Sequence, residues 1–302
     1  TSPITRTMYS RSIFEEGCIS ALASSPSVVN SNRPEVLKSR RPMEIQRSAD
    51  LLDVYAEEGM RLHDEVIVSQ PGEKIMVRRE PVGVVVAITP FNYPITLLCF
   101  KLGAALIAGC TVVAKPAEDT PLSTLLLAEL FHQAGYPAGC FNVVTGRGRG
   151  IGMAMVNHPI PGKVAFTGGT DTALKIRASM AEHLAPGAPL IAETGGLNAM
   201  LVDSTALPEQ VADAVVQSAF RSAGQRCSAL RLLCLHEGIA DHVIEMIQGA
   251  AKELVTGNPA ELATDLGPVI DAEAFDNIQR HVARLSSSAK ALLPEARPAQ
   301  AL

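Results

Sequence analysis

Two side chains in one stretch of the sequence have the chemistry of a thiol enzyme. Glu193 stands before Gly195-Gly196, and Cys227 follows the turn-forming residues Gly224-Gln225-Arg226. The glutamate and the cysteine are 34 positions apart, with a strand-like run and an amphipathic segment between them. A thiolate attacks carbonyl carbons, and a carboxylate can activate water. If both face one cleft, the pair predicts formation and hydrolysis of a thioester.

Cys227 differs from other cysteines of the chain in its surroundings. Cys99 and Cys110 lie inside apolar runs, as small core residues do. Cys227 lies between Arg226 and Ser228 at a polar turn. A basic side chain or free backbone N–H groups at such a turn lower the pKa of a thiol. The local pattern leaves both a structural and a catalytic role open for Cys227.

Glu193 and Asn92 each follow a predicted strand. Glu193 comes directly after the apolar residues 190–192, where a partly desolvated carboxylate has a raised pKa and acts as a general base. Asn92 lies between a strand and its helix, where a side-chain amide can donate to a developing oxyanion together with the N–H of Cys227. The alternatives are a solvated strand-end charge for Glu193 and a turn residue for Asn92.

Three segments are candidates for binding a phosphate or a ribose. Residues 146–152 are rich in glycine but contain no G-x-G-x-x-G pattern and no P-loop lysine. Gly168-Gly169 stands between a strand and a helix, where backbone amides can meet a pyrophosphate. Lys115 and Glu118 end another strand, where they can hydrogen-bond ribose hydroxyls. A structural turn is the alternative for each segment.

Apolar runs alternate with helical patterns along most of the chain, which indicates a parallel sheet covered on both faces. We therefore predict a doubly wound, Rossmann-like α/β domain whose ligand crevice lies at the carboxyl ends of the strands. An incomplete second α/β catalytic domain follows it. The predicted parts are an irregular segment 1–40, a dinucleotide-binding domain 41–195 and a partial catalytic domain 196–302. The predicted strands are 82–88, 111–114, 141–144, 164–166, 190–192, 199–202 and 232–235. The predicted helices are 42–62, 94–108, 120–135, 151–156, one from 171, 207–222 and 239–254.

Composition excludes several classes of function. The 302 residues carry a net charge of −5, which argues against nucleic acid as a partner. The longest apolar run, 95–114, is interrupted by Lys101 and two glycines, so no membrane span is expected. Six cysteines without a CxxC pair argue against a metal site or a disulfide framework and favour a reducing, cytoplasmic location.

Six motifs occur in one order between about residues 40 and 285, and together they resemble the aldehyde dehydrogenase family: ITPFNYP, VVAKPAEDTP, PAGCFNVVTG, VAFTGGT, AETGG and AGQRCS. The resemblance implies that Cys227 is the nucleophile, Glu193 the base and Asn92 the oxyanion donor. It implies NAD as cofactor, with Lys115 and Glu118 at the adenosine ribose. The implied cofactor-binding residues are Thr89, Pro90, Phe91, Lys115, Glu118, Gly168 and Gly169.

Within the family, the stretch 193–235 looks most like the aldehyde dehydrogenase domain of proline utilisation A. That domain oxidises L-glutamate 5-semialdehyde, the open form of 1-pyrroline-5-carboxylate, to glutamate. The resemblance implies that Ser228 helps to anchor this small-molecule aldehyde. The stretch 72–94 looks more like general aldehyde dehydrogenases, so a general or succinate-semialdehyde-type enzyme is an alternative. The charge of Glu118, which repels a 2′-phosphate, favours NAD over NADP.

The sequence also departs from the family pattern. Gly169 replaces a small hydroxyl residue, Ala173 a glycine and Leu197 a polar residue. The later E-x-F-G-P motif of the family is missing, so we expect a C-terminally truncated member. An inactive fragment that keeps a cofactor-binding fold is therefore an alternative, and a homo-oligomer or part of a larger bifunctional polypeptide are both open. A Cys–His thiol hydrolase is disfavoured, because His236 follows Cys227 beyond a strand that leads away.

Overall fold

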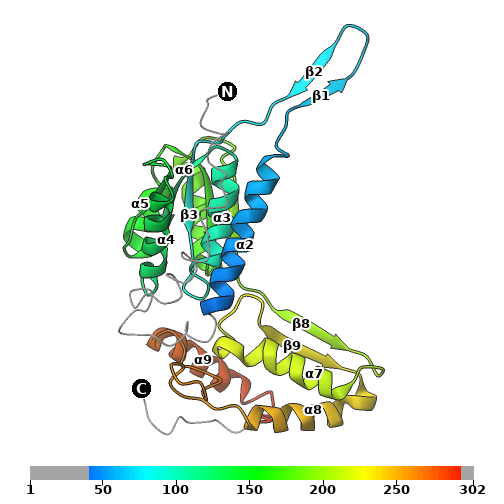
Figure 1. Ribbon diagram of the computed structural model, residues 1–302. Helices are drawn as coiled ribbons and strands as arrows, with labels where there is room; N and C mark the ends of the chain where they lie inside the picture. Colours follow the sequence, from blue (N-terminus) through cyan, green and yellow to red (C-terminus); the bar gives the residue numbers. More distant parts are fainter. Residues whose placement is uncertain (1–40, 294–302) are drawn as a thin grey trace. The chain divides into compact units, whose positions relative to one another are not determined.

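The structure is a computed structural model that describes residues 41–293, with side chains from residue 44 onward (Figure 1). The chain divides into two compact units, and the boundary falls between Thr194 and Gly195. The prediction for residues 1–40 lies outside the described residues. Within residues 41–293, no helix combines the length and the apolar character that crossing a membrane requires.

The first unit alternates strands and helices after an initial long helix and a hairpin. Its helices are α2 (Arg41–Gly59), α3 (Thr96–Ile107), α4 (Pro121–Gln133), α5 (Met153–Val156) and α6 (Thr170–His183), with a π-helical turn at Gly148–Gly152. Its strands are β1 (Glu65–Val68), β2 (Lys74–Val77), β3 (Val84–Ile88), β4 (Thr111–Lys115), β5 (Phe141–Val143), β6 (Pro161–Thr167) and β7 (Leu190–Glu193). Gly109 and Gly135 end α3 and α4 with φ of 79° each, a conformation that residues with a Cβ rarely adopt.

Five parallel strands form the sheet of the first unit, in the order β5-β4-β3-β6-β7. The chain winds from β3 through β4 to β5 on one side and then continues at β6 and β7 on the other. The strand order therefore reverses beside β3, where ligands bind in open α/β sheets. The predicted doubly wound α/β architecture is confirmed.

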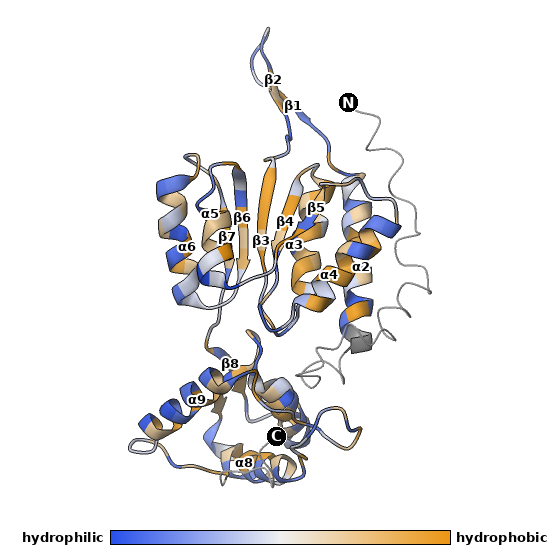
Figure 2. Ribbon diagram, turned by 90° about the vertical axis from the view of Figure 1, so that its left-hand side faces the viewer, coloured by the Kyte–Doolittle hydropathy of each residue, from blue (hydrophilic) through white to orange (hydrophobic). Residues whose placement is uncertain are grey.

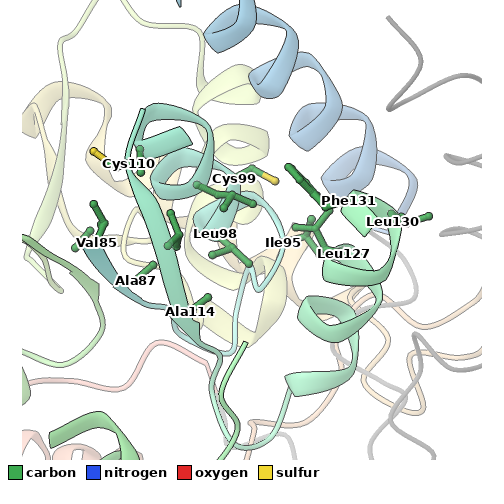
Figure 3. Close-up of a cluster of buried hydrophobic side chains, with 14 of the residues drawn as sticks. Val85, Ala87, Ile95, Leu98, Cys99, Cys110, Ala114, Leu127, Leu130 and Phe131 are labelled. Carbon is green, nitrogen blue, oxygen red and sulfur yellow. The ribbon is translucent and has the colours of Figure 1, made fainter. Parts of the chain in front are cut away.

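Helices cover both faces of this sheet, with α2, α3 and α4 on one face and α5 and α6 on the other (Figure 2). Successive residues of β3 point to opposite faces, as in any strand. Val85 and Ala87 belong to the core under α3 and α4, whereas Val86 belongs to the core under α6. Figure 3 shows the first of these cores, in which Leu98 and Leu127 are fully buried.

The hairpin β1–β2 stands apart from the sheet. Its two strands pair in antiparallel fashion, and all of their residues are exposed. Arg79 anchors its base, because its backbone N–H donates to Asp64 and its guanidinium pairs with Glu65 at 2.8 Å. This hairpin was not among the predicted elements.

The second unit contains a two-stranded parallel sheet, β8–β9, and helices that bury one apolar cluster against it. Its elements are β8 (Asn198–Val202), α7 (Pro208–Val215), β9 (Leu230–Leu235), α8 (Glu237–Lys252) and α9 (Ala272–Leu285). The predicted helix 207–222 is regular only as far as Val215. A π-helical turn, Val216–Phe220, and a 3₁₀ turn, Arg221–Gly224, replace its last two turns. Helix α9 was not predicted, and residues 286–293 form turns after it.

Candidate active site

The carboxyl ends of the parallel strands bring most of the predicted cofactor residues of the first unit to one edge. Lys115 ends β4 opposite Ile88, and Glu193 ends β7 opposite Thr167. The backbone N–H of Thr89 donates to the Lys115 carbonyl at 3.1 Å. Lys115, Glu193 and the turn that begins at Thr89 therefore share the edge at which doubly wound sheets hold dinucleotides.

Lys115 and Glu118 are held in place by short contacts. Lys115 is buried and donates from Nζ to the Pro116 carbonyl at 2.9 Å. Burial lowers the pKa of Lys115, and the charge of Glu118 opposes this shift. Glu118 is exposed, and its Oε2 accepts from the N–H of Gly148 at 3.2 Å. The glycine-rich segment after β5 therefore supports Glu118, and binding of a ribose by the two side chains stays a prediction.

The turn between β3 and α3 carries four of the predicted residues. The Thr89 hydroxyl is buried and has no hydrogen-bond partner among the described residues, which fits a site that a ligand completes. Pro90, Phe91 and Asn92 are half-buried. The Leu97 N–H donates to the carbonyl of Tyr93 at 3.1 Å, so the end of this turn is tied to the first turn of α3.

That Gly168 and Gly169 approach a pyrophosphate stays a prediction, but the N–H of Gly168 is engaged within the chain. The Gly168 N–H already donates to the Glu193 carbonyl at 3.1 Å. Gly168 is also needed for close packing, because a Cβ there would lie 2.6 Å from the ring of Phe166. Gly169 precedes the first residue of α6 and has open space around it. The N-terminus of α6, with its unpaired N–H groups, keeps the capacity to bind an anion.

Lys101 of α3 is a candidate that the sequence analysis did not assign. Its Nζ donates to the Thr167 hydroxyl at 2.6 Å and to the Leu97 carbonyl at 3.4 Å. Burial lowers the pKa of Lys101 to about 8, and the negative charge of Glu193 opposes this shift. The signal in the sequence is a single lysine that interrupts the long apolar run 95–114.

Glu193 is exposed at the end of β7, so the expected partial desolvation of its carboxylate is absent in the described chain. Its link to the edge is electrostatic and through the backbone. The carboxylate is close enough to Lys101 to act on the pKa of that lysine. Its carbonyl accepts from Gly168, which fixes the end of β7 against β6.

In the second unit, Cys227 stands at a strained and exposed turn. Ser222 and Ala223 have φ of 60° and 53°, and Gly224 follows with φ of 67°. Left-handed backbone is unfavourable for residues with a Cβ, and such strain gathers at functional sites. The turn that follows presents both Cys227 and Ser228 at the surface of the described chain.

A clamp of hydrogen bonds holds the Cys227 turn. Asn198 at the start of β8 donates from Nδ2 to the Cys227 carbonyl at 2.7 Å and to the Ala229 carbonyl at 2.8 Å. Asn198 was missed in the sequence, although a polar residue opening an apolar strand was a visible signal. Arg226 donates from Nη2 to the carbonyls of Gln217 and Ser218, each at 2.7 Å. Arg226 therefore helps to hold the turn, and an effect of its charge on the thiol stays a prediction.

A model of the aldehyde dehydrogenase family matches residues 32–301. The chain belongs to the aldehyde dehydrogenase family. Relatives include the bifunctional protein PutA of Klebsiella aerogenes, 50% identical over 205 residues that make up 67% of this chain and 16% of PutA. The NADP-dependent succinate-semialdehyde dehydrogenase GabD of Escherichia coli (strain K12) is 36% identical over 241 residues, 80% of this chain and 49% of GabD.

A solved structure has the same fold as this chain. The D779W mutant of proline utilization A (PutA) from Bradyrhizobium japonicum superposes with a TM-score of 0.83 at 44% identity. The match covers 93% of this chain and 28% of that PutA chain. The chain thus spans about half or less of the length of these relatives.

Proposed function

We propose that this chain carries the nucleophile, the base, the oxyanion donor and the adenosine-binding edge for NAD-dependent oxidation of L-glutamate 5-semialdehyde to glutamate. The observation that carries the proposal is the Cys227 turn. An exposed thiol follows three consecutive left-handed residues, and Asn198 fixes the carbonyls on both sides of Ser228. A structural cysteine needs neither the strain nor the exposure.

Each residue has one role in the reaction. The Cys227 sulfur attacks the aldehyde carbon, and the Asn92 amide, with the Cys227 N–H, donates to the oxygen that becomes negative. One oxyanion donor of this kind contributes about 3 kcal/mol to transition-state stabilisation. NAD, when bound, supplies the hydride acceptor. Glu193 then takes a proton from water, and the resulting hydroxide hydrolyses the thioester on Cys227.

The substrate and the cofactor follow from different features. Identity to PutA is 50%, against 36% to the succinate-semialdehyde enzyme, which favours glutamate semialdehyde over a general or succinate-type substrate. The exposure of Ser228, directly after the nucleophile, supports a role in anchoring that aldehyde. The Glu118 carboxylate at the ribose edge favours NAD, because it repels the 2′-phosphate of NADP.

The same relatives support a place in a larger bifunctional polypeptide, with a homo-oligomer as the alternative. A cytoplasmic location is supported by the cysteines. The five in the described residues are free thiols, which fits a reducing compartment.

The test is to mix the purified chain with NAD and glutamate semialdehyde and to follow NADH absorbance. We expect NADH to form, faster with NAD than with NADP and faster than with succinate semialdehyde. Cys227→Ser abolishes turnover, whereas Cys234→Ser, which alters another exposed thiol of the second unit, leaves turnover intact. Glu193→Gln gives a burst of NADH without turnover, and Glu182→Gln, at an exposed position of α6, is its matched control.

Two outcomes contradict the proposal. If the folded chain binds NAD but forms no NADH, the chain is the alternative, an inactive fragment that keeps a cofactor-binding fold. Turnover that survives Cys227→Ser refutes the assignment of the nucleophile.

A further inference from the structure

A buried carboxylate on α2 caps the helix that carries Lys101. Glu44 is 7% exposed, and its Oε1 accepts the backbone N–H groups of Ile95 at 2.9 Å and of Thr96 at 3.1 Å. These are the N-terminal N–H groups of α3, which have no acceptor within their own helix. Ile95, the N-cap residue, makes no side-chain cap bond. A carboxylate is favoured at this position by the positive end of the helix dipole.

Two hydroxyl groups complete the junction between α2 and α3. Ser48 donates from Oγ to the Glu44 carbonyl at 2.7 Å, and its Oγ lies 3.0 Å from the Thr96 Oγ1. The Thr96 hydroxyl also reaches the Glu44 carbonyl at 3.2 Å. Ser48 is 1% exposed and Thr96 is 4% exposed, so these polar groups lie inside the apolar contact of the two helices. One turn of α2 therefore determines where α3 begins.

The beginning of α3 determines the position of two groups at the sheet edge. Asn92 lies three residues before Ile95, in the turn that the bond from Leu97 to Tyr93 ties to α3. Lys101 lies one helical turn beyond Leu97, and its Nζ contacts the Leu97 carbonyl as well as Thr167. A shift of the first turn of α3 would thus displace both polar groups.

We propose that Glu44 is a positioning residue that holds Asn92 and Lys101 at the sheet edge by capping α3 from a neighbouring helix. The consequence for catalysis through Asn92 rests on the proposed function. The consequence for Lys101 does not, because it concerns the position of a buried amine in the folded chain.

Two substitutions separate the cap from the charge. Glu44→Ala removes both the negative charge and the acceptor, whereas Glu44→Gln removes the charge and keeps an acceptor oxygen. The matched control is Asp53→Ala, which removes an exposed carboxylate from the same helix. Thr96→Val keeps the two N–H contacts of Glu44 and removes only the hydroxyl, so it provides a second and milder variant.

The first measurement is alkylation of Cys99 in the native chain, located by peptide mass spectrometry. Cys99 lies in the first turn of α3 and is fully buried, so it reacts only when that turn opens. Figure 3 shows its side chain in the core under α2 and α4. We expect Glu44→Ala to accelerate alkylation about tenfold or more, Thr96→Val to accelerate it less, and Glu44→Gln and Asp53→Ala to leave it near the wild-type rate.

The second measurement is the pKa of Lys101, read by NMR of ¹³C-methylated lysines. We expect Glu44→Ala to raise it from about 8 toward the ordinary lysine value, because water enters the loosened site. Glu44→Gln should restore the wild-type pKa. In an active chain, Glu44→Ala should also lower kcat with little change in the KM for NAD.

Unchanged Cys99 alkylation and an unchanged Lys101 pKa in Glu44→Ala would overturn the proposal. So would a Glu44→Gln variant that behaves like Glu44→Ala. If Glu44→Ala shifts both Cys99 alkylation and the Lys101 pKa while the wild-type chain forms no NADH, the positioning of Lys101 is upheld and the proposed oxidation is refuted.

Discussion

Replacing Lys101 by methionine should change how stability depends on pH. In the folded chain the pKa of Lys101 is about 8, against an ordinary 10.5. Between these values the unfolded chain binds more protons than the folded chain, so the free energy of unfolding rises with pH. Below about pH 8 the folded chain bears the full free-energy cost of burying the protonated amine, which amounts to about 3 kcal/mol. Lys101→Met removes this penalty and keeps most of the apolar stem.

The assay is urea unfolding of the wild type and of Lys101→Met at about pH 7 and about pH 9.5. The stabilisation of the variant relative to the wild type should be about 2 kcal/mol larger at the lower pH. Loss of the bond to Thr167 subtracts about 1 kcal/mol at both pH values and cancels in that comparison. Lys175→Met, which replaces an exposed lysine of α6, is the control and should show no such dependence. If the difference in unfolding free energy between Lys101→Met and the wild type does not depend on pH, the assignment of a lowered pKa to a buried Lys101 amine is refuted.

Three further substitutions test the packing around the site. Asn198→Ala removes two hydrogen bonds that clamp the cysteine turn and should destabilise the second unit by about 2 kcal/mol, measured by thermal denaturation. Gly168→Ala places a methyl group against the Phe166 ring, so a loss of about 1–3 kcal/mol in urea unfolding and weaker NAD binding by calorimetry are expected. Leu127→Ala empties a fully buried site and should lose about 3 kcal/mol, whereas Leu125→Ala, 42% exposed on the same helix, should lose far less.

The centre of the five-stranded sheet could be predicted because β3, β4 and β6 are largely buried on both faces. Such strands appear as continuous apolar runs, and the helices between them begin and end at recognisable residues, as α4 does at Pro121 and Gly135. The hairpin β1–β2 escaped prediction for the opposite reason. Its residues are all exposed, so no burial imposes a pattern on them.

Helix α9 and the end of α7 show a different limit. Four apolar side chains of α9 recur at helical spacing, Phe275, Ile278, Val282 and Leu285, and none of them is buried. The pattern of a helix is thus present in the sequence, although no helix was predicted from it. The segment after Val215 has helical composition, yet the chain adopts left-handed backbone at Ser222 and Ala223. Propensity favours helix there, and only the contacts of the folded turn overrule it.

The Cys227 turn shows that residue type alone does not predict which partner a long polar side chain contacts. The sequence places a basic residue beside Cys227, and chemistry alone predicts that its charge acts on the thiol. In the fold, the Arg226 guanidinium donates to two carbonyls of the preceding π-helical turn, and Asn198, 29 residues earlier, holds the cysteine carbonyl. Long side chains can reach several partners, so the sequence cannot choose among them. The doubly wound architecture could be inferred because it depends on many residues together. A single guanidinium is placed by the local backbone, and that backbone is itself irregular at this turn.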